Sequence, residues 1–297
     1  MKISTFFLLL LTLTAFATNS ILCRLALISQ SIGPVEFTII RLGSGMLILL
    51  PLIFFHSKFF TTTSTQQQML KLKISNFWQP LALFGYAIFF SLAYVILDTG
   101  IGALILFPTV QITMVGISIY QGNKLSKNEW IGFVIALAGL FYLLSPGITA
   151  PSFLGTLLMI ASGVSWGAYS ILGKKEPIPI LATARNFLFC LPAVFILSFI
   201  ILFQYYQTEI LVISRQGLFL AILSGAVASG MGYVLWYVSL QKISTTAASI
   251  SQLVVPVFAA LGGIFFLHES INSRLLIASL LIFSGIIITI LNRKQIA

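Results

Sequence analysis

Long apolar runs separated by short polar interruptions predict ten membrane-spanning helices in this chain. A helix needs about 20 apolar residues to cross about 30 Å of hydrocarbon, and the runs reach that length. Their approximate ranges are 4–24, 35–55, 78–97, 100–120, 129–145, 153–172, 179–203, 217–239, 245–267 and 272–291. The predicted fold class is an all-α membrane protein.

The eighth and ninth predicted spans are interrupted by small and polar residues and are joined only by residues 241–244. Small residues allow helix backbones to approach closely in lipid. Gln252 needs a partner or water, because an unsatisfied polar group in hydrocarbon costs several kcal/mol. We therefore expect this hairpin to face other helices or a cavity.

Short matches between the two halves of the chain indicate an internal duplication. The matching segments are 16–22 with 166–172, 93–97 with 232–236, and 123–139 with 269–285. Each half holds five predicted spans, an odd number, so the two copies would lie upside down relative to each other, a common transporter construction. We expect ten helices in a 5+5 arrangement, with one repeat over 1–147 and an inverted one over 148–297.

Composition agrees with the membrane class and changes the interpretation of the charge. Hydrophobic residues make up 59% of the chain and charged residues 7%, with a net charge of +10. The basic residues lie in short loops, which argues against a nucleic-acid partner and favours the cytoplasmic lysine bias. Every lysine falls on one side of the predicted topology, so both termini are expected to be cytoplasmic.

The N-terminus imitates a cleaved signal peptide at Ala15-Phe16-Ala17. We favour a retained first helix, because residues 16–22 take part in the internal repeat.

Polar and aromatic side chains recur inside the first, third, fourth, sixth, eighth and ninth spans. The main ones are Asn19, Tyr94, Gln111, Trp166, Tyr169, Tyr233, Trp236 and Gln252. One interpretation is helix-to-helix hydrogen bonding or an interfacial aromatic belt. The other is a polar cavity between the helices.

Two prolines, Pro108 and Pro256, interrupt the fourth and ninth spans. A proline inside a helix removes one backbone hydrogen bond and kinks the helix locally. Each is either a hinge or a static kink, and the sequence favours neither.

Two arginines, Arg41 and Arg185, lie about seven residues into the second helix of each half. A charge at such depth marks a partner, a water-filled space or a functional site; the alternative is snorkelling to the headgroups. The expected partners are Asp98 or Glu269 for Arg41, and Glu176 or Glu129 for Arg185. Either arginine could instead attract a substrate carboxylate.

Enzymatic and cofactor chemistry has little support. Cys23 and Cys190 lie in apolar surroundings and are expected to be free thiols, and no metal-ligand spacing is present. We predict no metal and no cofactor. The pair His268-Glu269 lacks a further ligand, so an integral-membrane enzyme is a disfavoured alternative.

The eighth and ninth spans also carry a family resemblance. The order Ser-Gly, Gly-Tyr-x-x-Trp-Tyr, Ala-Ala, Gln-Leu-x-x-Pro-Val-x-Ala-Ala and then Glu269 resembles the EamA-like branch of the drug/metabolite transporter superfamily. The resemblance implies that the helices bearing the intramembrane polar residues surround a central cavity, and that these residues line it. It also implies export of amino acids or other metabolites, or transport of nucleosides, vitamins or drugs.

Two features depart from patterns in the same superfamily. Its small multidrug exporters use a buried glutamate in the first helix, and this first helix has no acidic residue. Asn123 stands where the repeat places Glu269, which leaves the first half without that carboxylate.

The resulting expectation is a secondary transporter, an exporter of a small polar metabolite, with the amino-acid class first by family analogy. It would act by alternating access as a monomer or weak dimer in the bacterial inner membrane, with a small-molecule substrate and the lipid bilayer as partners. The alternatives are a multidrug or cationic-compound exporter, the enzyme considered above, and an accessory membrane protein without transport.

Overall fold

The computed structural model describes residues 3–60, 77–122, 126–145, 147, 150–208, 213–243, 245–270 and 272–291. All elements within this part of the chain are helical, apart from an isolated antiparallel bridge between Ile32 and Ile213. Each of the ten ranges expected to span the membrane coincides with one helix or with one nearly continuous run of helical segments.

The first half contains α1 (Ile3–Ile28), α2 (Pro34–Phe60), α4 (Trp78–Tyr94), α5 (Thr99–Tyr120) and α6 (Lys127–Leu144). The second half contains α7 (Phe153–Gly173), α8 (Pro179–Thr208), α9 (Arg215–Leu223), η2 (Ser224–Met231), α10 (Gly232–Lys242), α11 (Thr245–Ser251), η3 (Gln252–Val254), α12 (Val255–Leu267) and α13 (Ser273–Leu291). Seven of these helical runs are long and apolar enough to cross a membrane by length and composition, and two shorter apolar helices are Trp130–Leu144 and Ser273–Gly285.

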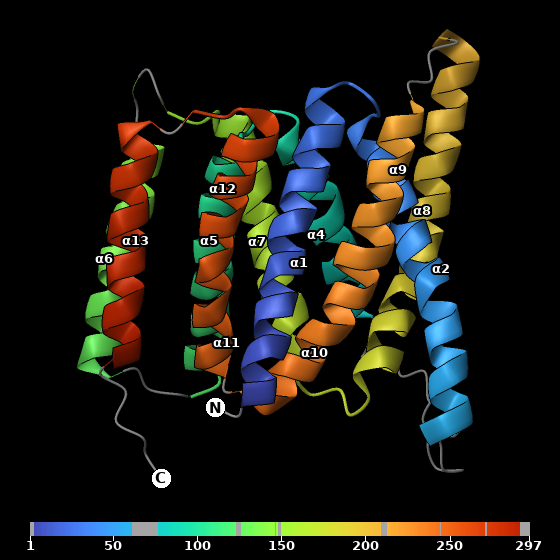
Figure 1. The fold of residues 1–297 in the computed structure, drawn as a ribbon. Coiled ribbons are helices and arrows are strands. Elements are labelled where there is room, and N and C mark those ends of the chain that lie inside the picture. The colour runs from blue at the N-terminus through green and yellow to red at the C-terminus, as the bar shows by residue number, and fades with distance from the viewer. Residues whose placement is uncertain are drawn as a thin grey trace.

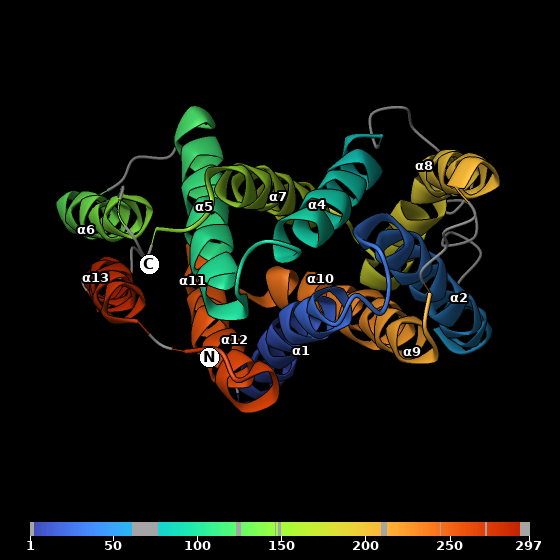
Figure 2. The ribbon, with the colours of Figure 1, turned by 90° about the horizontal axis from the view of Figure 1, so that it is seen from above.

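The helices stand roughly side by side in one bundle (Figure 1). Seen from above, α6 and α13 pair at one edge and α2 and α8 lie at the other, with the remaining helices between them (Figure 2). Large apolar side chains cover the outside: Phe199 is 70% exposed and Phe265 is 73% exposed. Such a surface matches hydrocarbon rather than water, and the protein is an integral membrane protein.

The helices that carry the polar core pack in two similar sets. In one set α7 packs against α4 and α5, and in the other α1 packs against α12 and the run from α9 to α10. α1 and α7 run in opposite directions along the bundle (Figure 1). We call the end that holds the C-terminus of α1 the upper end and the end that holds the C-terminus of α7 the lower end, as they appear in Figure 1.

The prolines have different local effects. α5 continues as an α-helix through Pro108. The ninth run instead contains a short 3-10 segment, Gln252–Val254, directly before Pro256 near the start of α12. The expected interruption is therefore present at Pro256, and the expected kink at Pro108 does not break the helix.

The eighth run contains a feature that the sequence did not reveal, a π-helical segment over Ser224–Met231. This segment lies directly against α2, and an added Cβ at Gly225 would overlap the backbone carbonyl of Arg41 and the hydroxyl of Ser44. Only glycine allows this backbone approach. π-helical turns are rare and occur frequently at functional sites.

Candidate functional site

The eight polar and aromatic residues expected inside the spans are all buried. None of them is more than 4% exposed. They lie on α1, α4, α5, α7, α10 and η3, so the fold brings together helices from both halves of the chain. All of them except Gln111 are connected, directly or through neighbouring aromatic rings, into one polar and aromatic core between those helices.

Two tryptophans on facing helices donate hydrogen bonds within this core. Trp166 Nε1 donates to Gln252 Oε1 at 2.7 Å, and Trp236 Nε1 donates to Ser170 Oγ at 3.0 Å. The partner that Gln252 requires in an apolar helix is thus Trp166, and each indole N–H is satisfied.

Asn19 connects three helices. Its Nδ2 donates to the hydroxyl of Tyr86 at 3.2 Å, and its Oδ1 accepts from Ser224 Oγ at 2.7 Å. The side chain therefore joins α1 to α4 and to the π-helical segment.

Two aromatic residues that the sequence analysis did not select complete the core. The ring of Phe16 lies 5.2 Å from Trp166 and 5.5 Å from Trp236. The ring of Tyr86 lies 4.7 Å from Trp166, and the rings of Trp166 and Tyr233 are also 4.7 Å apart. Phe16 occupies the place of Trp166 in the internal repeat, which was an available signal for it.

Arg41 lies in this core and is 1% exposed. Its Nε donates to Ser229 Oγ at 2.9 Å and its Nη2 donates to the Tyr233 hydroxyl at 2.5 Å. The expected contact with Asp98 or Glu269 is absent, and that prediction was wrong. Arg41 points into the bundle, and a different arginine binds those two carboxylates.

That arginine is Arg24, near the C-terminus of α1. Its Nη2 lies 3.0 Å from Asp98 Oδ1, its Nε lies 3.6 Å from Glu269 Oε1, and its Nη1 donates to the carbonyl oxygens of Tyr94 and Val95. The signal in the sequence was an arginine inside the last turns of an apolar helix, opposite acidic residues at other helix ends. The arrangement links α1 to the α4–α5 turn and to Glu269, which follows α12, at the upper end.

The lower end carries the predicted partner of Arg185. Its Nη2 donates to Glu176 Oε1 at 2.7 Å and to Gln79 Oε1 at 2.9 Å, and Gln79 Nε2 donates to the same carboxylate oxygen at 2.8 Å. The proposed pair of Arg185 with Glu176 is confirmed. The side chain of the other candidate, Glu129, lies outside the described residues, as does Asn123.

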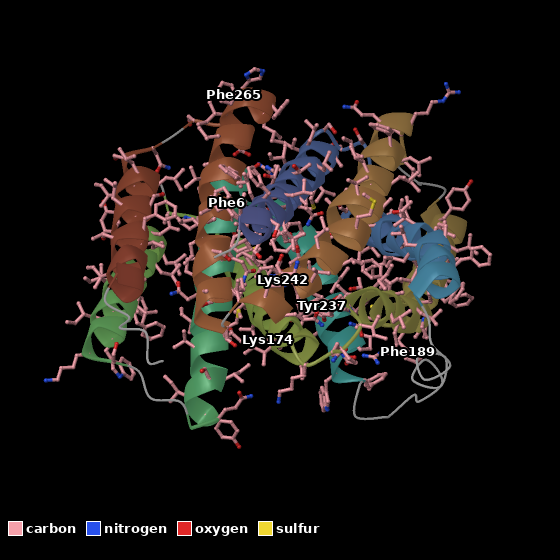
Figure 3. All side chains as sticks on the ribbon, turned by 60° about the horizontal axis from the view of Figure 1, so that its bottom comes forward. Phe6, Lys174, Phe189, Tyr237, Lys242 and Phe265 are labelled. Carbon is pink, nitrogen blue, oxygen red and sulfur yellow. The ribbon has the colours of Figure 1, made fainter. Side chains whose placement is uncertain are left out.

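Lys174 directly follows α7 and also lies at the lower end. Its Nζ donates to the Ile243 carbonyl oxygen at 3.1 Å and to Thr245 Oγ1 at 2.9 Å. It thereby holds the turn between α10 and α11, and partial burial lowers the pKa of its ammonium group. Figure 3 labels Lys174 and Lys242 at the end that comes forward in that view.

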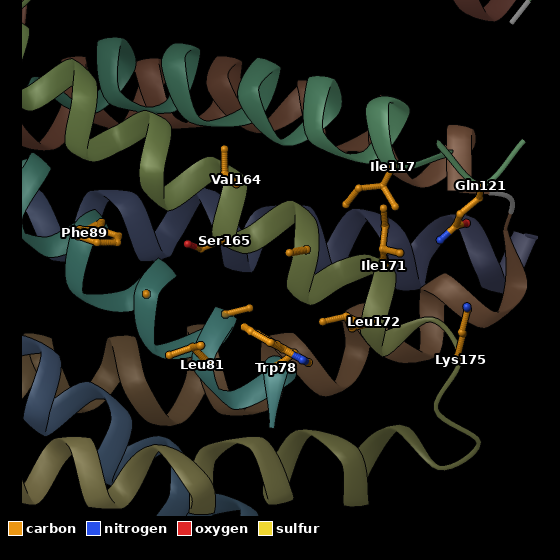
Figure 4. Close-up of a pocket in the computed structure, with 13 residues that line it drawn as sticks. Trp78, Leu81, Phe89, Ile117, Gln121, Val164, Ser165, Ile171, Leu172 and Lys175 are labelled. Atoms are coloured by element: carbon orange, nitrogen blue, oxygen red, sulfur yellow. The ribbon is translucent and has the colours of Figure 1, made fainter. Parts of the chain in front are cut away.

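A cavity of about 550 Å³ lies between α4, α5 and α7 (Figure 4). Its walls are mainly apolar, with Ser165, Gln121 and Lys175 as polar lining. None of the eight residues expected to line a central cavity borders this cavity, and Trp166 of α7 instead binds Gln252. In this structure the rings of Trp166, Tyr169 and Tyr233 pack against one another.

Among the described residues no cluster of three or more His, Cys, Asp and Glu side chains could hold a metal ion. The site instead offers aromatic faces, hydroxyls, amides and one buried guanidinium. Such a set can bind and orient a polar molecule.

A polytopic helical membrane protein with a polar core between its two halves is the class that this fold and site define. The EamA-like transporter family model matches residues 153–291. An uncharacterized protein of Pseudomonas aeruginosa is 40% identical over 285 residues, which cover 95% of this chain and 93% of the relative. The chain belongs to the EamA-like transporter family.

Two other relatives are described as transporters. The uncharacterized transporter YoaV of Bacillus subtilis is 26% identical over 262 residues, covering 86% of this chain and 87% of that protein. The uncharacterized inner membrane transporter YedA of Escherichia coli is 32% identical over 82 residues, which are 28% of this chain and 26% of that protein. A solved crystal structure superposes with a TM-score of 0.63 at 18% identity over 95% of this chain and 96% of that chain. That last likeness concerns the fold.

Proposed function

We propose that this protein is a secondary transporter that exports a small polar metabolite, of the amino-acid class, by alternating access between two inverted repeats. The repeats are residues 1–147 and 148–297, each with five membrane-spanning helices. The protein would act as a monomer or weak dimer. The observation that carries the proposal is that the two halves make corresponding contacts at opposite ends of the bundle.

The clearest correspondence involves Arg24 and Lys174. Extending the ungapped match of 16–22 with 166–172 places these two residues at equivalent positions. Arg24 binds the turn between the third and fourth helices of the first half at the upper end, and Lys174 binds the corresponding turn of the second half at the lower end. In each repeat a basic side chain thus binds the turn between the third and fourth helices, and the two turns lie at opposite ends of the bundle.

The second helix of each half supports the same relationship. α2 begins at Pro34 and α8 at Pro179. Four residues later, Thr38 Oγ1 donates to the Pro34 carbonyl oxygen at 2.8 Å and Thr183 Oγ1 donates to the Pro179 carbonyl oxygen at 2.9 Å. The two helices therefore start with the same sequence spacing and the same side-chain hydrogen bond.

Inverted repeats are a recurrent construction in secondary transporters, with substrate bound at the repeat interface and access alternated by movement of one unit against the other. The polar core described above lies where helices of both halves meet. The lower end carries Lys174, Lys175 and Lys242, so the cytoplasmic lysine bias supports a cytoplasmic lower end with both termini on that side. The relative described as an inner membrane transporter supports a bacterial inner membrane as the location.

Purified protein reconstituted into liposomes tests this proposal. Vesicles loaded with one L-amino acid should accumulate the same labelled amino acid from outside by counterflow, whereas empty vesicles should not. All proteinogenic amino acids are screened, followed by cationic drugs as the alternative substrate class. Counterflow of cationic drugs alone would replace the amino-acid class, and no counterflow with any compound would contradict the transport proposal.

A further inference from the structure

Arg41 differs from every other described arginine whose side-chain contacts are given, because it is fully enclosed and lacks a carboxylate partner. The ion pairs among the described residues involve Arg24 and Arg185. Arg41 is bound by the two hydroxyls of Ser229 and Tyr233, and its Cζ lies 5.1 Å from the ring centres of both Tyr86 and Phe90. Its Nη1 is buried and has no hydrogen-bond partner.

Without a bound ligand, burying the Arg41 charge in this environment destabilises the folded protein. A buried charge loses its hydration, and hydroxyls and aromatic faces replace only part of it. A charged side chain inside a membrane protein therefore marks a functional contact by default. The free Nη1 is the atom at which that contact is incomplete.

The second half of the chain carries a neutral residue at the corresponding place. Counted from the first residue of each helix, Arg41 is the eighth residue of α2 and Asn186 is the eighth residue of α8. Asn186 is also fully buried, and its Nδ2 lies 3.4 Å from the Tyr237 hydroxyl. Arg185, one residue earlier, points to the lower end instead. The core consequently has one positive centre, without a counterpart related by the repeat.

The surroundings of Arg41 are built from elements of both halves. Ser229 lies on the π-helical segment and Tyr233 on α10, whereas Tyr86 lies on α4 and contacts Asn19 of α1. Movement of one half against the other would change the space in front of the guanidinium. That movement would therefore change the affinity for a ligand bound there and could release it.

We propose that Arg41 binds the carboxylate of the transported molecule, which makes the substrate an organic carboxylate; this inference rests on the proposed transport function. A guanidinium binds a carboxylate through two parallel N–H···O bonds. The free Nη1 supplies one donor. Nη2 supplies the other when its hydrogen bond to the Tyr233 hydroxyl is replaced by one to the substrate carboxylate. The core offers no carboxylate for an ammonium group among its described residues, so aromatic rings and amide oxygens would contact the remainder of the substrate.

Ligand binding is measured first, without transport. Detergent-purified protein is heated with L-amino acids, with the corresponding amino-acid amides, and with the 2-hydroxy acids of the same side chains. The proposal predicts that at least one carboxylate raises the melting temperature and that its amide does not. If the 2-hydroxy acid acts equally well, the carboxylate is the recognised group and the amino group is not.

Three variants separate binding from folding. Arg41→Lys keeps the charge and loses the planar pair of donors, so the ligand should bind about tenfold or more weakly, and Arg41→Gln should not bind it detectably. Arg215→Gln is the matched control, because Arg215 is exposed at the start of α9, and it should bind like the wild type. Without ligand, Arg41→Gln should melt no lower than the wild type, because it removes a buried charge that has no carboxylate partner.

A fourth variant places a carboxylate inside the protein. Ser229→Asp puts it beside the Arg41 Nε, where Ser229 Oγ lies at 2.9 Å, and Ser229→Asn is its neutral control. The internal carboxylate should raise the melting temperature of the ligand-free protein and abolish ligand binding, whereas the asparagine variant should retain binding.

The outcomes distinguish this inference from the proposed function. Amides that bind as tightly as acids, binding that survives in Arg41→Gln, or no carboxylate binding at all would overturn the assignment of Arg41. Counterflow that persists in Arg41→Gln would overturn it while leaving transport intact. Arg41-dependent binding without counterflow in liposomes would support the carboxylate site and contradict transport.

Discussion

The carboxylate of Glu269 accepts hydrogen bonds from both the backbone N–H and the hydroxyl of Thr99. The Thr99 backbone nitrogen lies 2.9 Å from Oε1 and 3.0 Å from Oε2 of Glu269, and Thr99 Oγ1 lies 2.9 Å from Oε1. Thr99 is the first residue of α5, in the first half, and Glu269 follows α12, in the second half. A carboxylate at a helix N-terminus satisfies free N–H groups and complements the helix dipole. This contact joins the two halves at the upper end.

Removing the charge of Glu269 should weaken that junction more than removing the charge of Asp98. The Glu269 side chain is 11% exposed and the Asp98 side chain is 50% exposed, and both lie near Arg24. We expect Glu269→Gln to lower the stability of the folded protein by about 1–2 kcal/mol, because the substitution removes the ion pair and the negative charge at the helix N-terminus and leaves one acceptor oxygen for Thr99. Asp98→Asn should cost about 0–1 kcal/mol, since exposed ion pairs contribute little. Thermal unfolding in detergent measures both, and an equal loss would contradict this ranking.

The sequence predicted the positions of the helices well and the partners of the buried arginines less well. Long apolar runs predict helices, and the ten expected ranges coincide with helical runs, of which seven are long and apolar enough to cross a membrane. Whether an arginine points inward or along its helix depends on neighbouring helices, and for this reason Arg41 was given partners that Arg24 binds. The opposite case is Arg185: its partner Glu176 is close in sequence and was one of the two predicted candidates.

The π-helical segment and the cluster around Tyr86 could not be derived from local sequence. The run Ser224–Met231 consists mainly of glycine, alanine and serine, which indicate close packing without specifying a π-helix. Tyr86 lies in an apolar helix, where a tyrosine is also typical of lipid-facing or interfacial positions. Its role depends on Asn19 and Trp166, which belong to other helices.

The hydrogen bond between Trp166 and Gln252 should show strong coupling in a double-mutant cycle. Gln252→Leu leaves the Trp166 N–H buried without an acceptor, which costs about 1–3 kcal/mol. Trp166→Phe in the same protein removes the unsatisfied N–H, so the double variant should be less unstable than the sum of the single variants predicts. Unfolding of the four proteins measures the coupling. Additive effects would show that this bond contributes little.

Accessibility of introduced cysteines tests the orientation. Cys23 and Cys190 are buried and free, so the native thiols should react slowly. Single cysteines at Gln30 and Ser270, exposed at the upper end, should react with an impermeant maleimide in intact cells. Cysteines at Lys175 and Gln241, at the lower end, should react only after lysis. Labelling of Lys175→Cys in intact cells would reverse the orientation.

The two cation-held turns should contribute to transport rather than to assembly alone. Arg24→Gln and Lys174→Gln each remove hydrogen bonds to one turn, at opposite ends. We expect both variants to reach the membrane and to show counterflow reduced about tenfold or more, because the turns no longer hold the closed ends. Lys175 is the exposed neighbour of Lys174. The variant Lys175→Gln is therefore the control and should transport normally. Equal rates in all three variants would make the turns purely structural.

The central claim is that the two halves open and close opposite ends of one bundle. Electron spin resonance distances in liposomes test it most directly, with one label pair at Gln30 and Ser270 across the upper end and another at Phe77 and Lys175 across the lower end. When a transported substrate is added, we expect one distance distribution to shift to longer values while the other shifts to shorter ones. Two distances that stay unchanged, or that lengthen and shorten together, would contradict alternating access between the two halves.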